Sequence, residues 1–346
     1  MNFLACDLGG TKVLLGIFEK AINDASPILI FKKKYISSDW NSFDLIIEDF
    51  LKNECKNISH PSSACFAVAG PLSNNNVKIM NLSWNISGNE LKKKFDFKSC
   101  ELINDFAVQI YGIPYLKKNQ YSTIQNGGST IDANNDLHAI VGAGTGLGIA
   151  RGIISGEKIK VLASEGGHVE YSPKSKLEWE LKIWLKNYLK VERISCERII
   201  SGTGLSRVAE WRLSKPDAQN HPLQKYFKGM KISDALRKEI PEKICNLSNE
   251  GDQLMNEVEE IWLGAYASLL GDVALQELCF GGLWISGGTA SKHFKNFKSD
   301  LFMKQFFDKG RLKDILKSIP LKIILDEEFG LFSAACRAKM LLKNTQ

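Results

Sequence analysis

The chain has 346 residues, of which 44% are hydrophobic and 24% are charged, and 45 basic against 39 acidic residues give a formal net charge of +6. This length and composition indicate an ordinary globular protein with two domains. The lysines and arginines form no block longer than three, so the charge excludes a polybasic nucleic-acid-binding segment and we expect no nucleic-acid partner.

The N-terminus lacks a basic segment followed by a long apolar run, and no window of about 18 uninterrupted apolar residues occurs, so we expect no export signal and no membrane span. The eight cysteines form no CxxC pair and lie mostly in apolar stretches such as "SSACFAVAG". This usage is typical of reduced thiols and predicts a cytoplasmic protein.

The first informative segment is "FLACDLGGTKVLLGIF", residues 3–18. Two apolar runs flank a Gly-Gly turn, which predicts a β-hairpin. The patterns of a dinucleotide-binding turn and of a P-loop are both absent from the chain. Gly9 and Gly10 would let backbone N–H groups approach an anion, Thr11 adds a hydroxyl, and Asp7 could hold a metal ion through water. A purely structural hairpin with a capping aspartate is the alternative.

Residues 102–106 read "LINDF", so that apolar residues lead directly into Asn104 and Asp105. We expect a strand that ends at these two polar residues. Ligands of open α/β sheets lie at the carboxyl ends of strands, which makes this pair a candidate site. For each residue alone, a turn or a helix cap is the alternative.

A second copy of the hairpin design follows in "HAIVGAGTGLGIARGII", residues 138–154. Glycine occupies positions 142, 144, 146 and 148, at a cost of roughly 0.5–1 kcal/mol each relative to alanine. A ligand that approaches the backbone explains this cost better than a plain strand pair. The repeat predicts an internal duplication with two phosphate-binding edges around one cleft.

The remaining segments concern packing more than chemistry. Residues 177–191 predict an amphipathic helix that serves either a homodimer or packing within the subunit. The polar stretch 212–250 predicts an insertion of loops and helices. From 252 to 278, apolar residues recur at helical spacing, which predicts a core helix.

The last glycine cluster lies in "GGLWISGGTASKHF", residues 281–294. An apolar strand ends at Ser286, and Gly287 and Gly288 precede an expected helix start at Thr289. A strand, a glycine pair and a helix N-terminus form a suitable wall for the base and ribose of a nucleotide. The small-residue turn "SGTGL", residues 201–205, would form the facing wall.

In this order the segments resemble the bacterial glucokinases of the hexokinase and actin-like ATPase superfamily. The resemblance rests on "DLGGTK", "AGPL…NLSW", "LINDF", "GAGTGLG", "EGGHVEY", "CERIISGTGL", "WISGG", "DKGRLKDIL" and "DEEFGLFSAA". It implies a duplicated ribonuclease H-like α/β fold with two domains around a central cleft. We expect a smaller domain at 1–104, completed by the C-terminal segment 329–346, and a larger domain at 105–328.

The resemblance also implies the site residues and the cofactor, Mg-ATP. Asp105 matches the catalytic base, and the residues matching the sugar site are Asn104, Asp105, Glu165, His168 and Glu197. Carboxylates suit a hexose because they accept strong hydrogen bonds from its hydroxyls. The expected ATP-binding residues are Cys6, Asp7, Leu8, Gly9, Gly10, Thr11, Gly144, Thr145, Gly146, Gly287 and Gly288, with Asp7 holding the metal ion through water.

The predicted function is therefore glucokinase, an ATP:hexose 6-phosphotransferase of glycolysis, with glucose and ATP as partners. The alternatives are a sugar-sensing regulator without catalysis, a kinase for another hexose, and an acyl or polyol kinase on the same fold. Lys12 departs from the family pattern, where many members have Asn. The cysteine-rich zinc motif of the related repressor and sugar-kinase family does not follow "EGGHVEYSPKSK", so that zinc site is not expected.

Overall fold

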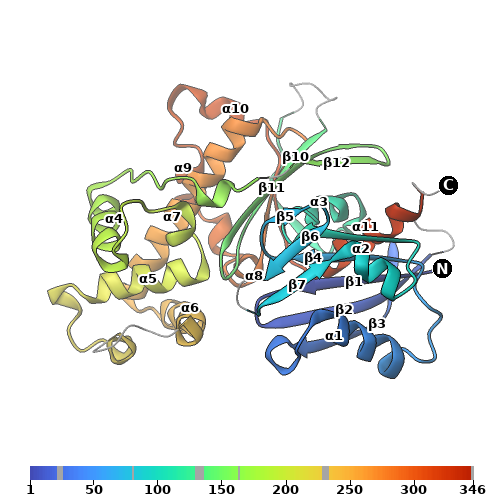
Figure 1. Cartoon of the computed structure of the whole chain (residues 1–346). Helices are drawn as coiled ribbons and strands as arrows, with labels where there is room; N and C mark the ends of the chain where they lie inside the picture. The colour runs from blue at the N-terminus through green and yellow to red at the C-terminus, as the bar shows by residue number, and fades with distance from the viewer. Residues whose placement is uncertain (22–25, 80–81, 129–135, 163, 228–233, 344–346) are drawn as a thin grey trace. The chain divides into compact units, whose positions relative to one another are not determined.

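The computed structural model describes residues 1–21, 26–79, 82–128, 136–162, 164–227 and 234–343. Asn81 of the "NLSW" segment and residues 228–233 of the predicted insertion lie outside this part of the chain. By its internal contacts the chain divides into two compact units, whose elements are labelled in Figure 1. Unit 1 consists of Met1–Gln120, Ala150–Ala163 and Asp326–Gln346, and unit 2 of Tyr121–Ile149 and Ser164–Leu325.

Unit 1 is built on a five-stranded sheet of β1 (Asn2–Leu8), β2 (Lys12–Lys20), β3 (Pro27–Ile36), β4 (Ser63–Val68) and β8 (Ser99–Asn104). Their order is β3-β2-β1-β4-β8. The predicted hairpin is confirmed, because β1 pairs antiparallel with β2 and Asp7 lies opposite Leu14. The strands β1, β4 and β8 run parallel to one another.

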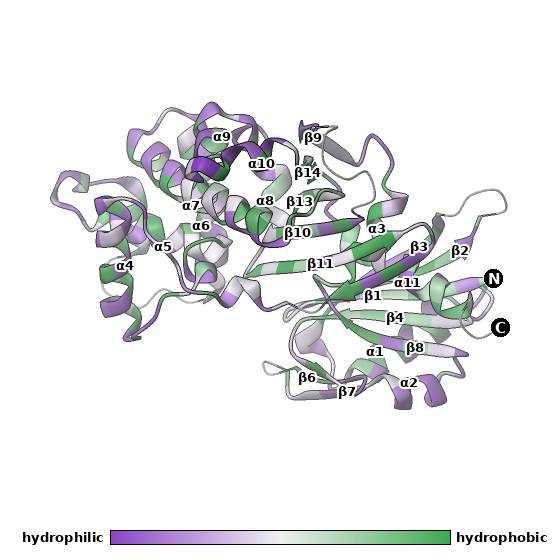
Figure 2. Ribbon diagram, turned by 90° about the horizontal axis from the view of Figure 1, so that it is seen from above, coloured by the Kyte–Doolittle hydropathy of each residue, from purple (hydrophilic) through white to green (hydrophobic). Residues whose placement is uncertain are grey.

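The two faces of this sheet follow from the alternation of side chains along β1. Leu4 and Cys6 lie in one core cluster, which includes residues of α1 (Phe43–Asp49). Phe3 and Ala5 lie in another, which includes residues of α11 (Phe329–Lys343). Successive side chains of a strand point to opposite faces, so a strand apolar at nearly every position is covered on both sides. In Figure 2, β1 and β4 carry mainly hydrophobic colours, whereas α2 (Gly88–Lys94) is mainly hydrophilic.

The free edge of β8 is closed by a side chain from a neighbouring turn. β5 (Leu72–Ser73), β6 (Asn76–Ile79) and β7 (Trp84–Ser87) form a separate three-stranded sheet. Asn75, between β5 and β6, accepts a hydrogen bond from Leu102 N at 2.7 Å through Oδ1 and donates one to Cys100 O at 3.1 Å through Nδ2. This amide replaces a strand partner and holds β8 just before its polar end.

The C-terminal helix α11 packs on this sheet and on α3 (Gln109–Gly112). Gly112 of α3 permits close contact with α11, since a Cβ at this position would lie 2.2 Å from Ser333 Oγ. Arg337 pairs with Glu101 of β8 at 2.5 Å and lies over the ring of Tyr111 at 4.7 Å. The helix therefore supports β8 from one face of the sheet.

Unit 2 contains the parallel strands β10 (Leu137–Ala143), β13 (Gly282–Ser286) and β14 (Leu321–Ile324), with β9 (Tyr121–Gln125) antiparallel at the edge. The strand β11 (Leu147–Ser155) follows β10 after a three-residue turn and is its neighbour in the sheet. It continues into unit 1, where it pairs antiparallel with β12 (Lys158–Leu162). A hairpin followed by parallel strands repeats the order seen in unit 1, as the predicted duplication requires.

Helices make up the rest of unit 2: α4 (Lys176–Leu189), α5 (Gly202–Leu213), α6 (Asp234–Asn249), α7 (Gln253–Glu277), α8 (Gly288–Lys292), α9 (Asp300–Phe306) and α10 (Lys313–Lys317). The predicted core helix is confirmed in α7, where Trp262 and Tyr266 are fully buried. It starts at Asp252, whose carboxylate accepts a hydrogen bond from Met255 N at 3.0 Å. Single helical turns occur in both units at Ser37–Asp39, Phe50–Glu54, Ile113–Tyr115, Gly166–His168, Cys196–Arg198, Pro216–Ala218, Pro222–Tyr226, Asn296–Lys298 and Gly310–Leu312.

The contact units divide the chain differently from the predicted domains. Residues 105–120 and 150–163 belong to unit 1, whereas the prediction placed them in the larger domain. The first segment contains α3, which packs on α11. In the second segment, Gly152 lies so close to Ile110 that a Cβ added at Gly152 would be 2.7 Å from Ile110 Cγ2. A unit formed from three separated segments has no single boundary along the sequence.

All eight cysteines are free thiols, and seven of them are buried. Burial raises the pKa of Cys6 and Cys65, which keeps both thiols protonated. In the part of the chain that the structure describes, no helix is both long enough and apolar enough to cross a membrane.

Candidate active site

The predicted polar pair stands where β8 ends. Asn104 is the last residue of the strand and lies opposite Val68 of β4. Its Oδ1 accepts hydrogen bonds from the N–H groups of Phe106 and Ala107, both at 3.0 Å. This leaves the Nδ2 amide as the donor that Asn104 can direct at a ligand.

The backbone of Asp105 is held equally firmly. Its N–H donates to Val68 O at 3.1 Å, and its carboxylate Oδ1 accepts from Phe106 N at 3.0 Å. Asn104 and Asp105 are both partly exposed. A half-buried carboxylate on a fixed backbone is compatible with the role of a general base, which must reach the proton that it accepts.

The first glycine turn lies at the same edge of the unit 1 sheet. Leu8, Val68 and Asn104 are aligned in neighbouring parallel strands, so the turn that follows Leu8 and the end of β8 share the carboxyl edge of the sheet. Within the turn, Gly9 N already donates to Lys12 O at 3.0 Å. The N–H of Gly9 is thus used by the turn itself, and Gly10 and Thr11 are the exposed members of the predicted phosphate site.

Cys6 and Leu8, expected to contact ATP, have fully buried side chains in the core of unit 1. Their side chains therefore cannot line a nucleotide site, because strand alternation directs them into the core. Their backbone groups belong to a strand that is paired on both sides, and Leu8 O accepts a hydrogen bond from Ala69 N at 3.4 Å.

Asp7 is partly exposed between these two buried neighbours. Burial raises the pKa of its carboxyl group. Among the described residues it forms no ion pair, and a Cβ added at Gly330 of α11 would lie 3.3 Å from Asp7 Oδ2. A carboxylate without a basic partner fits a hydrated divalent cation, which would supply the missing charge.

The second glycine turn, in unit 2, is fixed to the start of α5. Gly144 N donates to Gly146 O at 2.8 Å inside the turn, and Gly202 N donates to Gly144 O at 2.8 Å. Thr203 Oγ1 donates to Thr145 O at 3.2 Å. The turn is therefore held by backbone and hydroxyl groups from a segment far along the chain.

The segment "SGTGL" is not the turn that its composition predicted. Ser201 is the N-cap of α5, and its Oγ accepts a hydrogen bond from Gly204 N at 2.9 Å. A serine followed by small residues is compatible with either structure, and the capping geometry decides for a helix.

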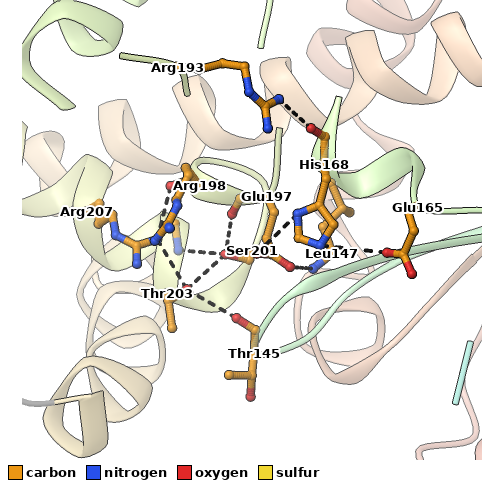
Figure 3. A network of polar contacts seen from close by, with 11 residues as sticks. Thr145, Leu147, Glu165, His168, Arg193, Glu197, Arg198, Ser201, Thr203 and Arg207 are labelled. Carbon is orange, nitrogen blue, oxygen red and sulfur yellow. Dashed lines mark hydrogen bonds and ion pairs between the residues drawn. The ribbon is translucent and has the colours of Figure 1, made fainter. Parts of the chain in front are cut away.

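Three predicted sugar-binding side chains gather in unit 2, as Figure 3 shows. His168 Nε2 lies 3.8 Å from Glu165 Oε2, and His168 Nδ1 lies 4.0 Å from Glu197 Oε1. The side chain of Glu165 is 74% exposed, that of His168 55% and that of Glu197 30%. Two carboxylates on either side of an imidazole form a polar, accessible cluster that can bind several hydroxyls at once.

Glu197 is fixed through its other oxygen. Leu147 N donates to Glu197 Oε2 at 3.1 Å (Figure 3). A Cβ at Gly146 would lie only 2.5 Å from the same Oε2. At this position the glycine admits a carboxylate of the protein itself, whereas the sequence had suggested a bound ligand as the reason.

A second glycine has a similar role beside His168. A Cβ at Gly167 would lie 2.1 Å from Leu147 O, so only glycine lets this turn meet the start of β11. Arg193 Nη1 donates to His168 O at 2.7 Å and anchors the turn from outside. Arg193 was not predicted from the sequence, since its spacing from His168 follows no motif.

The third glycine cluster has the predicted strand, glycine pair and helix. Gly287 has φ +92°, a conformation that favours glycine, and a Cβ there would lie 2.8 Å from Ala143 O. Thr289 Oγ1 donates to the same oxygen at 2.8 Å. At Gly288 no described atom lies within 4 Å of the Cβ position, so this glycine leaves open space. The pair lies at the same edge of the sheet as the second turn, because β10 and β13 are parallel.

The chain contains two hairpins with glycine turns, and each is followed by parallel strands with polar groups or glycines at their carboxyl ends. This repeated arrangement is the one expected of the hexokinase and actin-like ATPase fold. Comparison with known proteins agrees. A family model described as Glucokinase matches residues 4–341. A glucokinase of Synechocystis sp. is 34% identical over 354 residues, covering 98% of each chain.

Solved structures show the same fold. A glucokinase from an Antarctic psychrotroph has a TM-score of 0.79 at 27% identity, with 98% of this chain and 99% of that chain covered. A ROK family glucokinase from Streptomyces griseus, in complex with glucose and AMPPNP, has a TM-score of 0.62 at 16% identity, with 98% and 100% covered. The chain belongs to the glucokinase family. The predicted family, fold class and enzyme class are thereby confirmed, against a regulator without catalysis and against a kinase for another hexose.

Proposed function

We propose that this glucokinase transfers the γ-phosphoryl group of Mg-ATP to the 6-hydroxyl of glucose, with Asp105 as the general base. The observation that carries the proposal is the end of β8, where the backbone of Asp105 is held by Val68 at 3.1 Å and its carboxylate is partly exposed. Asp105 would accept the hydroxyl proton as that oxygen attacks phosphorus. General-base catalysis contributes roughly 10²–10⁴-fold, so positioning and electrostatics must supply the rest.

The sugar is held, in this proposal, by Asn104 together with Glu165, His168 and Glu197. The Nδ2 of Asn104 would donate to a hydroxyl, since its Oδ1 already accepts two backbone hydrogen bonds. The two glutamates would accept from hydroxyls, and the imidazole between them can do either. A site that pairs hydroxyls discriminates strongly against sugars that lack them.

The phosphates of ATP would lie at the two glycine turns, with Gly10, Thr11 and Thr145 as the exposed groups. Gly287 and Gly288 would border the adenosine. The choice of ATP as the donor is supported by the AMPPNP complex of the Streptomyces griseus enzyme, which has the same fold.

Asp7 is the residue that would hold Mg²⁺, through water, because its carboxylate has no basic partner among the described residues and burial raises its pKa. The ion, when bound, neutralises charge on the transferred phosphoryl group. The role of Asp7 is to keep the ion at the edge of the unit 1 sheet where Asp105 also lies.

We also propose a cytoplasmic enzyme of glycolysis, which eight free thiols support. A homodimer is proposed on the exposed apolar side chains of α4, namely Leu177, Trp179 and Ile183. Sedimentation of the purified chain tests this part of the proposal separately. A monomer at micromolar concentration would contradict it without affecting the proposed reaction.

A coupled assay of ADP formation with a panel of hexoses tests the proposed reaction. We expect turnover with glucose, and a fall in kcat of roughly 10²–10⁴-fold in Asp105→Asn. Asp96→Asn is a matched control, because Asp96 is an exposed turn residue of the same unit. The absence of glucose-dependent turnover in the wild type would contradict the kinase, and nearly full activity in Asp105→Asn would contradict the choice of base.

A further inference from the structure

Three side chains with metal-binding groups meet between helices of unit 2, apart from the residues assigned to catalysis. Cys245 lies on α6, Glu259 on α7, and His293 directly follows α8. One ligand atom from each residue lies within 4.8 Å of the other two. Glu259 is 6% exposed, His293 is 3% exposed, and Cys245 is partly exposed.

Two polar atoms of this cluster are buried without a hydrogen-bond partner among the described residues. They are Glu259 Oε1 and His293 Nδ1, which face each other at 3.4 Å. Burial raises the pKa of Glu259 and lowers the pKa of His293 to about 4. Leaving such groups unsatisfied is costly, and native interiors seldom contain them without a ligand, ion or water between them.

The neighbouring side chains hold the cluster in an orientation suited to a ligand. Glu259 Oε2 accepts hydrogen bonds from Ser248 Oγ at 2.7 Å and from Asn296 Nδ2 at 3.3 Å, which directs Oε1 toward His293. Burial and the Glu259 carboxylate raise the pKa of the Cys245 thiol, and the hydrogen bond that Asn249 Nδ2 donates to Cys245 Sγ at 3.7 Å acts against this rise. Hydrogen bonds of this kind orient the ligands in protein metal sites.

The chemistry of the donors selects the ion. A thiolate, an imidazole and a carboxylate suit Zn²⁺, whereas Mg²⁺ and Ca²⁺ prefer oxygen ligands alone. For tetrahedral zinc with bonds of about 2.0–2.2 Å to nitrogen and oxygen, the two ligand atoms lie about 3.3–3.5 Å apart. The observed 3.4 Å between Glu259 Oε1 and His293 Nδ1 agrees with this spacing.

We propose that Cys245, Glu259 and His293 bind one zinc ion that joins α6 to α7 and to the end of α8. With thiolate and carboxylate both ionised and the imidazole neutral, the charges of the three ligands cancel the charge of the ion, as a buried site requires. Water would be the fourth ligand, since Cys245 is partly exposed to solvent. This site is separate from the cysteine-rich motif of the related repressor family.

Cobalt is the probe for the test, because a thiolate bound to Co²⁺ gives a charge-transfer band in the near ultraviolet. The full-length chain, stripped with a chelator and free of nucleotide, is titrated with Co²⁺ and then with Zn²⁺. We expect one equivalent of Co²⁺, displacement by Zn²⁺, and a higher thermal midpoint with zinc. The alternative is a Glu-His pair that shares a proton and binds no metal, and it gives no band.

Variants assign the ligands. Cys245→Ser should abolish the band, and Glu259→Gln should weaken zinc binding strongly. Glu242→Gln changes an exposed carboxylate of α6, the helix of Cys245, and should leave zinc binding unchanged. Ser248→Ala removes a hydrogen bond to Glu259 and should weaken binding roughly 10–100-fold. The proposal is overturned if the wild type gives no band, or if a folded Cys245→Ser variant keeps both the band and the stabilisation by zinc.

Discussion

Replacing Gly146 by alanine separates the needs of folding from the needs of sugar binding. The added Cβ would lie 2.5 Å from Glu197 Oε2, whereas ordinary contact begins near 3.4 Å, so the carboxylate must retreat by the difference, about 0.9 Å. The hydrogen bond from Leu147 N, now 3.1 Å, is then lost or lengthened.

The effect on stability should be small, because the displaced atom is the end of a flexible, partly exposed side chain. We expect the free energy of unfolding to fall by less than about 1 kcal/mol. Sugar binding should suffer more, since a hydrogen bond from a hydroxyl to a charged group is worth about 1.5–3 kcal/mol. The KM for glucose should therefore rise roughly 10- to 150-fold.

Gly144→Ala is the matched control in the same turn, because no described atom lies within 4 Å of its Cβ position. This variant should leave the KM for glucose unchanged, and any effect should fall on the KM for ATP. Initial rates are measured with each substrate varied in turn, and urea unfolding reports stability. The reasoning fails if Gly146→Ala binds glucose normally, or if both variants raise the KM for glucose equally.

Variants at three further positions test other contacts by urea unfolding. Asn104→Ala leaves two backbone N–H groups without their acceptor and should lower the free energy of unfolding by about 1–2 kcal/mol. Asn104→Asp keeps an acceptor oxygen and should cost less. Equal losses in the two variants would contradict the role of Asn104 as the acceptor of these hydrogen bonds. Burial raises the pKa of Asp7, so the folded chain holds this proton more tightly than the unfolded chain, and ionisation costs stability as the pH rises past 3.8. Asp7→Asn should therefore be more stable than the wild type at pH 7, and the difference should vanish below pH 3.8. A difference that stays constant with pH would refute a raised pKa of Asp7 in the folded chain. Gly167→Ala places a Cβ 2.1 Å from Leu147 O, a backbone atom that cannot yield, and should cost about 1–3 kcal/mol or more; wild-type stability would show that the turn can move.

Much of the fold could be predicted because its signals are local. The apolar runs on either side of Gly9 and Gly10 became β1 and β2, and helical spacing from 252 to 278 became α7. The ends of β8 and β13 were also expected, since each strand stops at polar or glycine residues. "SGTGL" was misjudged because small residues suit both a turn and a helix start, and only the hydrogen bond to Ser201 Oγ decides.

The roles of individual glycines could not be predicted from the sequence. Gly146 and Gly287 both stand in glycine clusters that suggested a ligand near the backbone. In the structure, Gly146 makes room for Glu197, and Gly287 makes room for Ala143 O at a positive φ. The identity of the close neighbour depends on a segment distant in the chain, so no local pattern contains it.

The amino-acid sequence was enough to predict the two hairpins with their glycine turns, the ordered motifs of the glucokinase family and the polar pair at the end of β8, because each depends on neighbouring residues or on their order. The contact of Glu197 with Leu147 N, and the meeting of Cys245, Glu259 and His293 between their helices, arise from packing in three dimensions. Such contacts join residues far apart in the chain, and their distances are set by how helices and strands pack. Packing, rather than local pattern, therefore decided which side chains can act together.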